Sequence, residues 1–245
     1  MNSGIYTGYS GMQARLDALE TVANNLANLN TTGFKEVRTF YSFLSDSLGS
    51  PDDQGGLHAS INRAVRANGA VNQAAGSLAS TSRELDIAIE GDGFLAVQAP
   101  GGERYTRNGN LHLDRQSVLT TSGGYPVLGI SGRAITLGPG TVNINENGDV
   151  MLNGERVDRL KVVSIGDFSK LAKEGDSLFV YRGENTPAIS GHAAIKSGFL
   201  EQSNVNAVAS IVHMVDLLRH FEAIQKCINL EMNQMNGKAI EKLGR

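Results

Sequence analysis

SGIYTGYSGMQARLDALETVANNLANLN, residues 3–30, carries apolar side chains at alternating intervals of four and three residues. This spacing is the a/d pattern of helices that pair along a narrow apolar seam. The stretch therefore predicts an N-terminal helix that packs lengthwise on another helix through Ile5, Tyr9, Met12, Leu16, Leu19, Ala23 and Leu26.

The C-terminal end of the chain repeats this spacing. From Ala207 onward the apolar positions alternate in the same way, with Gln225 as the single polar residue among them. Matching patterns at the two ends predict two helices that pair in the manner of a coiled coil. The C-terminal members of this seam are Ile211, Met214, Leu218, Phe221, Ile228, Met232 and Met235.

Three glycines interrupt the first half of the N-terminal helix, at Gly4, Gly8 and Gly11. Each costs about 1 kcal/mol relative to alanine in a helix interior, and isolated helices are already marginal in water. We therefore expect this half to be ordered only against a partner, whose backbone the glycines allow to approach closely. The alternative is that the glycines keep a flexible tail.

The ends of both helices carry capping signals. The first helix is expected to begin at Asn2 or Ser3 and to end by residue 32, with Gly33 as the left-handed residue after the last turn. The second is expected to run from about residue 198 to residue 243, with Ser203 or Asn204 as its cap.

The middle of the chain alternates short apolar segments with turn residues. Such spacing is typical of a compact antiparallel sandwich or barrel. The predicted fold class is α+β, in which N- and C-terminal α-helices form a coiled-coil-like pair around an inserted, mainly antiparallel β domain. The predicted parts are an N-terminal assembly helix (1–33), an extended or loop connection (34–84), the β domain (85–196) and a C-terminal assembly helix (197–245). The predicted strands are 85–90, 94–99, 105–107, 111–113, 118–121, 134–137, 142–144, 150–152, 159–165 and 178–181.

Composition excludes several classes of protein. A net charge of −3 gives no general attraction to nucleic acid. No run of eighteen apolar residues predicts a membrane span, and the first twenty residues lack the apolar core of a cleaved secretory signal. The single cysteine, Cys227, excludes an internal disulfide and a thiolate metal cluster.

No local motif predicts catalysis, a cofactor or a metal ion. Residues 143–148 resemble the first half of a calcium loop, but the twelfth position is Gly154 instead of a carboxylate. A hairpin turn through Asn147 and Gly148 explains the pattern better. His213, Asp216 and His220 share one helix face and could chelate a metal, but a solvated polar face is the preferred interpretation.

The most specific local feature is the asparagine-rich block NNLANLNTTGFK, residues 24–35. Asparagine is unfavourable in a helix interior because its side chain competes for backbone hydrogen bonds. A plain helix cap needs one asparagine or glycine, whereas this block has four asparagines. We expect these side chains to be tied to the backbone at a constrained exit from the helix.

At these residues the chain resembles the bacterial flagellar rod and hook proteins. The resemblance covers nearly the whole chain, in order, through ANNLANLNTTGFK (23–35), LDIAIEGDGFLAVQ (85–98), YTRNGNLHLD (105–114), LTTSGGYPVLG (119–129) and SGFLEQSNVNAVASIVHMVDLLRHFEA (197–223). The motif residues it marks are Asn24, Asn25, Leu26, Ala27, Asn28, Thr32, Gly33, Phe34, Ser203, Asn204, Val205 and Asn206.

The resemblance implies a structural subunit of the flagellar basal-body rod, which crosses the periplasm as a drive shaft for motility. It implies export unfolded through the flagellar type III apparatus without signal cleavage. Other copies of the chain and neighbouring rod proteins would be the partners, with no nucleic acid, small-molecule substrate or membrane insertion. The short length of segment 35–85 and the stretch from Arg159 to Val163 resemble a proximal rod subunit more than a distal one. A distal rod subunit or another rod or hook protein is the alternative.

A second class of function is an alternative to assembly. A β-domain enzyme or carbohydrate-binding module with helical dimerisation arms would show a concave site lined by convergent polar or aromatic groups. Tyr105, His112 and Tyr125 are the residues around which such a site would form.

Overall fold

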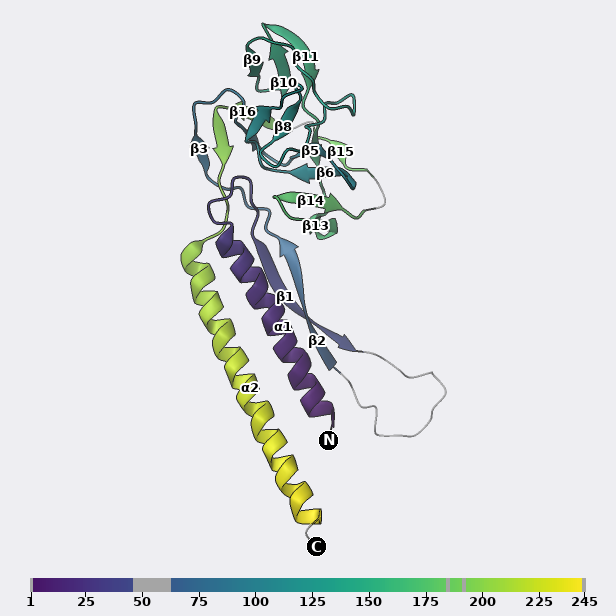
Figure 1. Cartoon of the computed structure of the whole chain (residues 1–245), viewed down its shortest axis with the longest axis vertical. Helices are drawn as coiled ribbons and strands as arrows, with labels where there is room; N and C mark the ends of the chain where they lie inside the picture. The colour runs from purple at the N-terminus through teal and green to yellow at the C-terminus, as the bar shows by residue number, and fades with distance from the viewer. Residues whose placement is uncertain (1, 46–62, 184–185, 191–192, 244–245) are drawn as a thin grey trace, which may run out of the picture. The chain divides into compact units, whose positions relative to one another are not determined.

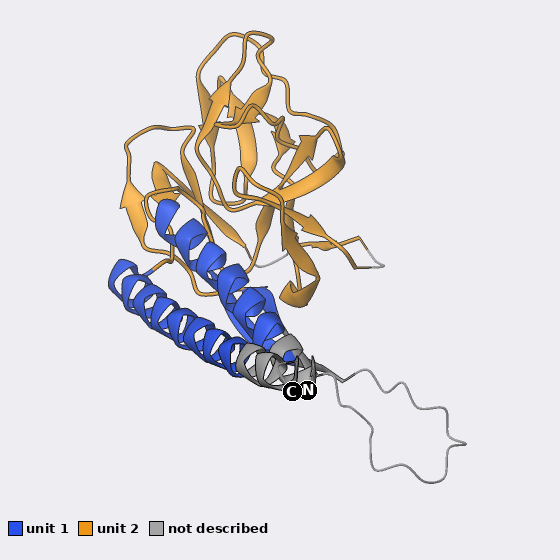
Figure 2. Cartoon of the chain, turned by 60° about the horizontal axis from the view of Figure 1, so that its bottom comes forward, with its two compact units in different colours: residues 1–27, 37–70, 206–245 blue, residues 28–36, 71–205 orange. Residues whose placement is uncertain are grey.

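The computed structural model describes residues 2–45, 63–183, 186–190 and 193–243. Two long helices accompany a mainly antiparallel β region, so the α+β class is confirmed. The chain divides into two compact units, coloured separately in Figure 2. The helical unit comprises residues 1–27, 37–70 and 206–245, and the β unit comprises residues 28–36 and 71–205.

The helical unit contains helices α1 (Asn2–Ala27) and α2 (Ala207–Leu243) and the paired strands β1 (Val37–Ser45) and β2 (Arg63–Val71). The two helices lie side by side along their length, and β1 lies against α1 (Figure 1). Between the strands, Asn68 Nδ2 donates a hydrogen bond of 2.8 Å to Ser42 Oγ. The connecting segment predicted as extended chain thus contributes a strand pair to this unit.

The C-terminal end of α1 and the N-terminal end of α2 differ from the expected bounds. α1 ends at Ala27, and a turn follows in which Asn28 O accepts a 3.1 Å hydrogen bond from Thr31 N. Gly33 has the expected left-handed backbone, with φ of +67°. α2 begins at Ala207, where Asn206 Oδ1 accepts a 3.0 Å hydrogen bond from Ala209 N. The expected cap at Ser203 or Asn204 is therefore wrong, because these residues precede the helix.

The β unit is built from several small antiparallel sheets. A six-stranded sheet has the order β13-β14-β6-β5-β12-β15, a three-stranded sheet has the order β11-β10-β9, and three pairs join β16 to β4, β17 to β3 and β7 to β8. A short 3₁₀ turn, η1 (Phe168–Lys170), precedes β13. The strands are β3 (Leu78–Ser80), β4 (Ile87–Glu90), β5 (Phe94–Ala99), β6 (Gly102–Thr106), β7 (Leu111–Leu113), β8 (Leu119–Thr121), β9 (Val142–Ile144), β10 (Asp149–Leu152), β11 (Glu155–Arg159), β12 (Val162–Ser164), β13 (Leu171–Lys173), β14 (Leu178–Tyr181), β15 (Ala188–Ile189), β16 (Ala194–Ser197) and β17 (Phe199–Glu201).

Strand β5 supplies both apolar cores of the β unit. Leu95 and Val97 belong to the larger cluster, whereas Phe94 and Ala96 belong to a second one on the opposite face of the strand. This two-sided burial explains why FLAVQA reads as a nearly continuous apolar run. In the second cluster Phe94 meets Phe179 edge to face, with ring centroids 5.7 Å apart.

Most predicted strands are confirmed within one or two residues, and four have the predicted bounds: 94–99, 111–113, 142–144 and 178–181. Predicted strands 105–107 and 159–165 begin three residues away from the first residues of β6 and β12. Residues 134–137 form only isolated bridges, to Leu128 and Val118. The helices described by the structure contain no stretch long and apolar enough to cross a membrane.

Candidate assembly site

Small side chains are buried at the centre of the α1–α2 pairing in the helical unit. Ala14, Ala18 and Val22 are buried at four-residue intervals along α1, and Leu217 of α2 is buried with them. Leu19, Met214 and Tyr41 pack around this cluster. Small residues repeated on one helix face let a second element approach closely, so these residues set the spacing within the unit.

The predicted seam divides into two rows with different burial. We call Met12, Leu19, Leu26, Met214, Phe221 and Ile228 the inner row, because each is half-buried in the helical unit. The outer row holds the alternate seam positions, which are exposed: Tyr9 (59%), Leu16 (41%), Ile211 (50%), Leu218 (45%) and Met232 (48%). Ile5 and Met235 lie in the helices, but their side chains fall outside the described part of the structure.

The sequence pattern did not single out the deepest contacts of the unit. Leu217 is buried, whereas its neighbour Leu218, assigned to the seam, is exposed. Ala14 and Ala18 were missed because apolar periodicity gives most weight to large side chains. The signal that could have found them is the recurrence of small residues at i, i+4 and i+8.

One of the early glycines serves close packing inside the chain. A Cβ atom on Gly8 would lie 3.2 Å from Cγ1 and 3.3 Å from Cδ1 of Ile228, which is tighter than an ordinary contact. A Cβ atom on Gly11 would have no atom within 4 Å. Gly8 is therefore packed closely against a side chain of α2 in the same chain, whereas the expectation for these glycines was the approach of a partner's backbone.

The asparagine block ties the end of α1 to the following strand. Buried Asn25 donates from Nδ2 to Val37 O at 2.8 Å and accepts at Oδ1 from Val37 N at 3.0 Å. One amide thus satisfies both peptide groups of the first residue of β1, as a neighbouring strand would. Asn28 Oδ1 accepts from the hydroxyl of Thr31 at 3.1 Å, whereas Asn24 and Ala27 are exposed.

The remainder of the N-terminal motif belongs to the β unit. Thr32 donates its hydroxyl hydrogen to Asn108 Oδ1 at 2.9 Å. A Cβ atom on Gly33 would lie 2.3 Å from backbone atoms of Arg107 and Asn108, so the motif needs glycine for both space and left-handed backbone. Phe34 is buried, with Lys173 Nζ 3.3 Å from its ring centroid.

The C-terminal motif is hydrogen-bonded to the residue segment that follows the N-terminal motif. Asn204 Oδ1 accepts from Glu36 N at 2.7 Å, and its Nδ2 donates to Ala74 O at 2.7 Å. Next to it, Val205 is buried and its N–H reaches Ser203 Oγ at 3.3 Å. Asn204, considered for a helix cap from sequence, instead bridges two remote pieces of backbone.

Three charged residues are buried where these motifs meet. Lys35 Nζ lies 2.6 Å from Glu201 Oε1, and Arg107 Nη1 lies 3.2 Å from Glu201 Oε2. Their exposed fractions are 2% for Lys35, 5% for Arg107 and 2% for Glu201. Burial lowers the pKa of Lys35, and the carboxylate of Glu201 opposes that shift. Charged groups this deeply buried are rarely found unpaired.

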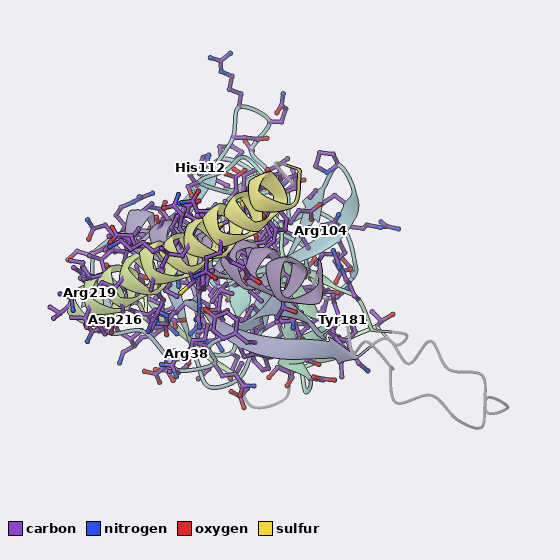
Figure 3. All side chains as sticks on the ribbon, turned by 90° about the horizontal axis from the view of Figure 1, so that it is seen from below. Arg38, Arg104, His112, Tyr181, Asp216 and Arg219 are labelled. Carbon is purple, nitrogen blue, oxygen red and sulfur yellow. The ribbon has the colours of Figure 1, made fainter. Side chains whose placement is uncertain are left out.

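The polar face of α2 lines a groove. This open groove has a volume of about 440 Å³, and its lining includes His213, Asp216 and His220 with Leu217 of α2 and Arg15 of α1. Figure 3 shows the side chains of α2, with Asp216 and Arg219 labelled. Among the described residues, no group of three His, Cys, Asp or Glu side chains is placed to hold a metal ion.

The segment resembling a calcium loop is a hydrogen-bonded turn. Asn145 Oδ1 accepts from the backbone N–H groups of Asn147 and Asp149, and Gly148 has a φ of +79°. The Asp149 carboxylate is engaged by Arg159 Nε at 2.6 Å, and these contacts hold the pKa of Asp149 below its ordinary value. A guanidinium group of the chain itself therefore faces the carboxylate of this turn.

The three residues considered for an enzymatic site have separate local contacts. Tyr105 is buried in the β unit, and burial raises the pKa of its hydroxyl. His112 Nε2 lies 3.2 Å from the hydroxyl of Thr120, and Tyr125 donates to Asp176 Oδ2 at 2.9 Å. These contacts support packing and loop structure and provide no nucleophile with an adjacent base.

The chain has two terminal helices and a β unit inserted between them in the sequence, and three family models place it in the class of flagellar rod and hook proteins. The flagella basal body rod protein model matches residues 5–35, the flagellar hook protein FlgE/F/G D1 domain model matches residues 88–152, and the flagellar basal body rod FlgEFG protein C-terminal model matches residues 196–241.

Curated relatives match over nearly their whole length. The chain is 34% identical to flagellar basal-body rod protein FlgF of Caulobacter vibrioides, covering 100% of this chain and 99% of the relative. It is 31% identical to FlgG of Bacillus subtilis, over 93% and 94% of the two chains, and 30% identical to FlgF of Rhizobium meliloti, over 100% and 99%. The chain belongs to the flagellar basal-body rod protein family, as a structural subunit that is more similar to this Caulobacter FlgF than to the Bacillus FlgG.

Proposed function

We propose that the chain occupies the FlgF position in the proximal rod and joins its neighbours through the outer row. The observation that carries this proposal is the exposure of alternate apolar seam positions on both helices, from Tyr9 and Leu16 on α1 to Ile211, Leu218 and Met232 on α2. Exposed large apolar side chains in a regular row are typical of an interaction surface.

The heptad pattern supports an occupant that is itself helical. In a coiled coil both the a and the d positions insert between side chains of facing helices. Within one chain the inner row is only half-buried and the outer row faces outward. A helix from a second subunit, laid along α1 or α2, completes the pattern and forms the coiled-coil-like contact.

The subunit in this proposal is exported unfolded through the flagellar type III apparatus and has no enzymatic role. Copies of the chain and neighbouring rod proteins are its partners in the periplasm. The two compact units serve different purposes in this proposal: α1 and α2 of the helical unit assemble, and the β unit, which is inserted between them in the sequence, is carried by them.

The experiment compares two sets of substitutions at matched positions. An outer-row variant, Leu16→Ser with Leu218→Ser, is expected to retain the helical circular dichroism and thermal unfolding of the wild type. An inner-row variant, Leu19→Ser with Phe221→Ser, is expected to lose helical stability, because these side chains pack within the chain. Both are introduced into a strain that lacks the wild-type chain.

The readouts are incorporation into isolated basal bodies and swimming. The folded outer-row variant is expected to be exported but absent from the rod, giving a non-motile strain. A strain that incorporates this variant at the wild-type level and swims normally would show that the outer row is not an assembly surface.

A further inference from the structure

Three buried charges hold together segments that are far apart in the sequence. Lys35 follows the N-terminal motif, Glu201 ends β17, and Arg107 follows β6. We call this group of three residues the clasp. Lys35 and Glu201 are 166 residues apart in the sequence, yet they share a 2.6 Å hydrogen bond.

The clasp contains two cations and one anion, and backbone carbonyls accept from the Lys35 amine and from both terminal nitrogens of Arg107. Glu201 Oε1 also accepts from Gly76 N at 2.9 Å. Lys35 Nζ also donates to Ala74 O at 2.8 Å, and Arg107 donates from Nη1 to Ile89 O at 3.1 Å and from Nη2 to Gly91 O at 2.7 Å. Arg107 Nε is buried without a hydrogen-bond partner. Glu201 is the only carboxylate among the three side chains, so both cations rely on it for a counter-charge.

Backbone hydrogen bonds close the chain around the clasp. Gly33 N donates to Glu201 O at 2.7 Å, and Gln202 N donates to Ser77 O at 2.8 Å. Strand β17 pairs with β3 next to these bonds. Residues 33–36, 74–80 and 199–204 thus form one closed collar, and α1 and α2 are connected in sequence to its two ends.

We propose that the clasp is a folding lock that closes last and orders both helix-bearing segments only after Glu201 has docked. Closing a contact over so many residues carries an entropy cost that nearby contacts do not. Removing three charged groups from water is favourable only where their partners are already in place. The carbonyls of Ile89, Gly91 and Ala74 are such partners, and they come from other segments of the β unit.

The lock gives a direction to folding of a chain delivered N-terminus first. This consequence, though not the lock itself, rests on the proposed function, because it assumes export as an unfolded chain. Until Glu201 arrives, Lys35 lacks the carboxylate of the clasp, so residues 33–36 cannot be closed onto residues 199–204, although Thr32 and Phe34 have other partners in the β unit. Premature closure of a partly exported subunit is thereby prevented.

The test uses the full-length chain and relies on the clasp having two positive side chains but only one negative side chain. Glu201→Gln leaves two buried cations without a carboxylate, whereas Lys35→Met leaves a matched pair of Arg107 and Glu201. We expect Glu201→Gln to raise the unfolding rate on the order of a hundredfold, and Lys35→Met by less than about tenfold. The refolding rate is expected to stay at the wild-type value in both variants, because the clasp forms after the transition state.

A matched surface pair provides the control. Lys196 Nζ and Glu90 Oε1 lie 3.3 Å apart, and their side chains are 46% and 50% exposed. Glu90→Gln and Lys196→Met are expected to leave both rates unchanged, since exposed ion pairs contribute little.

Hydrogen exchange tests whether the opening is local. In Glu201→Gln the amides of Gly33, Gly76 and Gln202 are expected to lose protection while those of β5 keep it. A refolding rate that falls in proportion to stability would place the clasp in the folding nucleus and overturn the proposal. Equal losses in Glu201→Gln and Lys35→Met, or uniform loss of protection across the β unit, would also overturn it. Because these measurements use the isolated chain, failure of the assembly proposal would leave them unaffected.

Discussion

A single lysine links the N-terminal motif to the edge of the six-stranded sheet. Lys173 lies over the ring of buried Phe34, and desolvation by its surroundings lowers the pKa of the amine to about 8. The aromatic face favours the charged amine, whereas burial favours the neutral one. Burial is the larger effect here, so the folded chain holds this proton less tightly than the unfolded chain does.

The pH dependence of stability follows from that difference. Between about pH 8 and the ordinary lysine value of 10.5, the unfolded chain binds more protons at this site, so the free energy of unfolding rises with pH. Over this pH range Lys173 is expected to raise the free energy of unfolding by an amount on the order of 1–3 kcal/mol. The value should lie near the lower end of this interval, because the Phe34 ring favours the charged amine. Denaturant titrations at pH 7 to 10 measure this contribution as the difference between the free energies of unfolding of wild type and Lys173→Met.

The control for this prediction is Lys170→Met, since the Lys170 side chain is 48% exposed. Its stability is expected to follow the wild-type dependence on pH. Parallel curves for wild type and Lys173→Met would show that the amine titrates normally in the folded chain.

At the scale of elements, the pairing of α1 with α2 depends on small residues as well as on the heptad positions. Ala18 is fully buried between large neighbours, whereas Ala23 on the same helix is exposed. An alanine in a closed contact has no room for a longer side chain. The two alanines therefore form a matched pair for testing which face of α1 packs within the chain.

Ala18→Met is expected to lower the free energy of unfolding of the helical unit by about 1–3 kcal/mol, because the added atoms force the elements apart. Ala23→Met is expected to change it by less than about 0.5 kcal/mol. Denaturation followed by circular dichroism at the helical minimum measures both. Equal effects of the two substitutions would contradict the packing seen here.

The sequence was informative where local chemistry decides the structure. A short apolar run between turn residues located β5, and Gly33 indicated a left-handed residue that the structure confirms. The bounds of α1 and α2 could not be predicted equally well, because Asn204 and Lys35 find partners far away in the sequence. The division of the seam into inner and outer rows was also beyond prediction, since heptad spacing does not say which helix each position faces.

For the whole molecule, the two compact units differ in how much apolar surface they bury. The buried cluster of the helical unit consists of Ala18, Val22 and Leu217, with partly buried neighbours. The β unit has two larger clusters, centred on Leu95 and Phe94. Burial of apolar area is the main favourable contribution to folding, so the units have unequal stability.

Thermal unfolding of the isolated chain is therefore expected to show two transitions. The helical signal in circular dichroism falls first. The near-ultraviolet tyrosine signal falls in two steps, because Tyr9 and Tyr41 lie in the helical unit, whereas Tyr105, Tyr125 and Tyr181 lie in the β unit. Calorimetry on the same sample checks that the two transitions are separate. A single transition that coincides in both signals would mean that the units unfold as one.

The collar around Glu201 also bears on how such a chain can diversify. Because residues 33–36 and 199–204 are bonded to each other, everything between β3 and β17 is an insertion whose two ends are already joined. Insertions with adjacent ends can be lengthened, shortened or exchanged. In this chain the exchange has to keep Arg107, Asn108 and Lys173, because they contact residues of the collar. A different β module can thus be carried by the same pair of helices, and the collar residues mark the points at which the two parts of an engineered chimera should be joined.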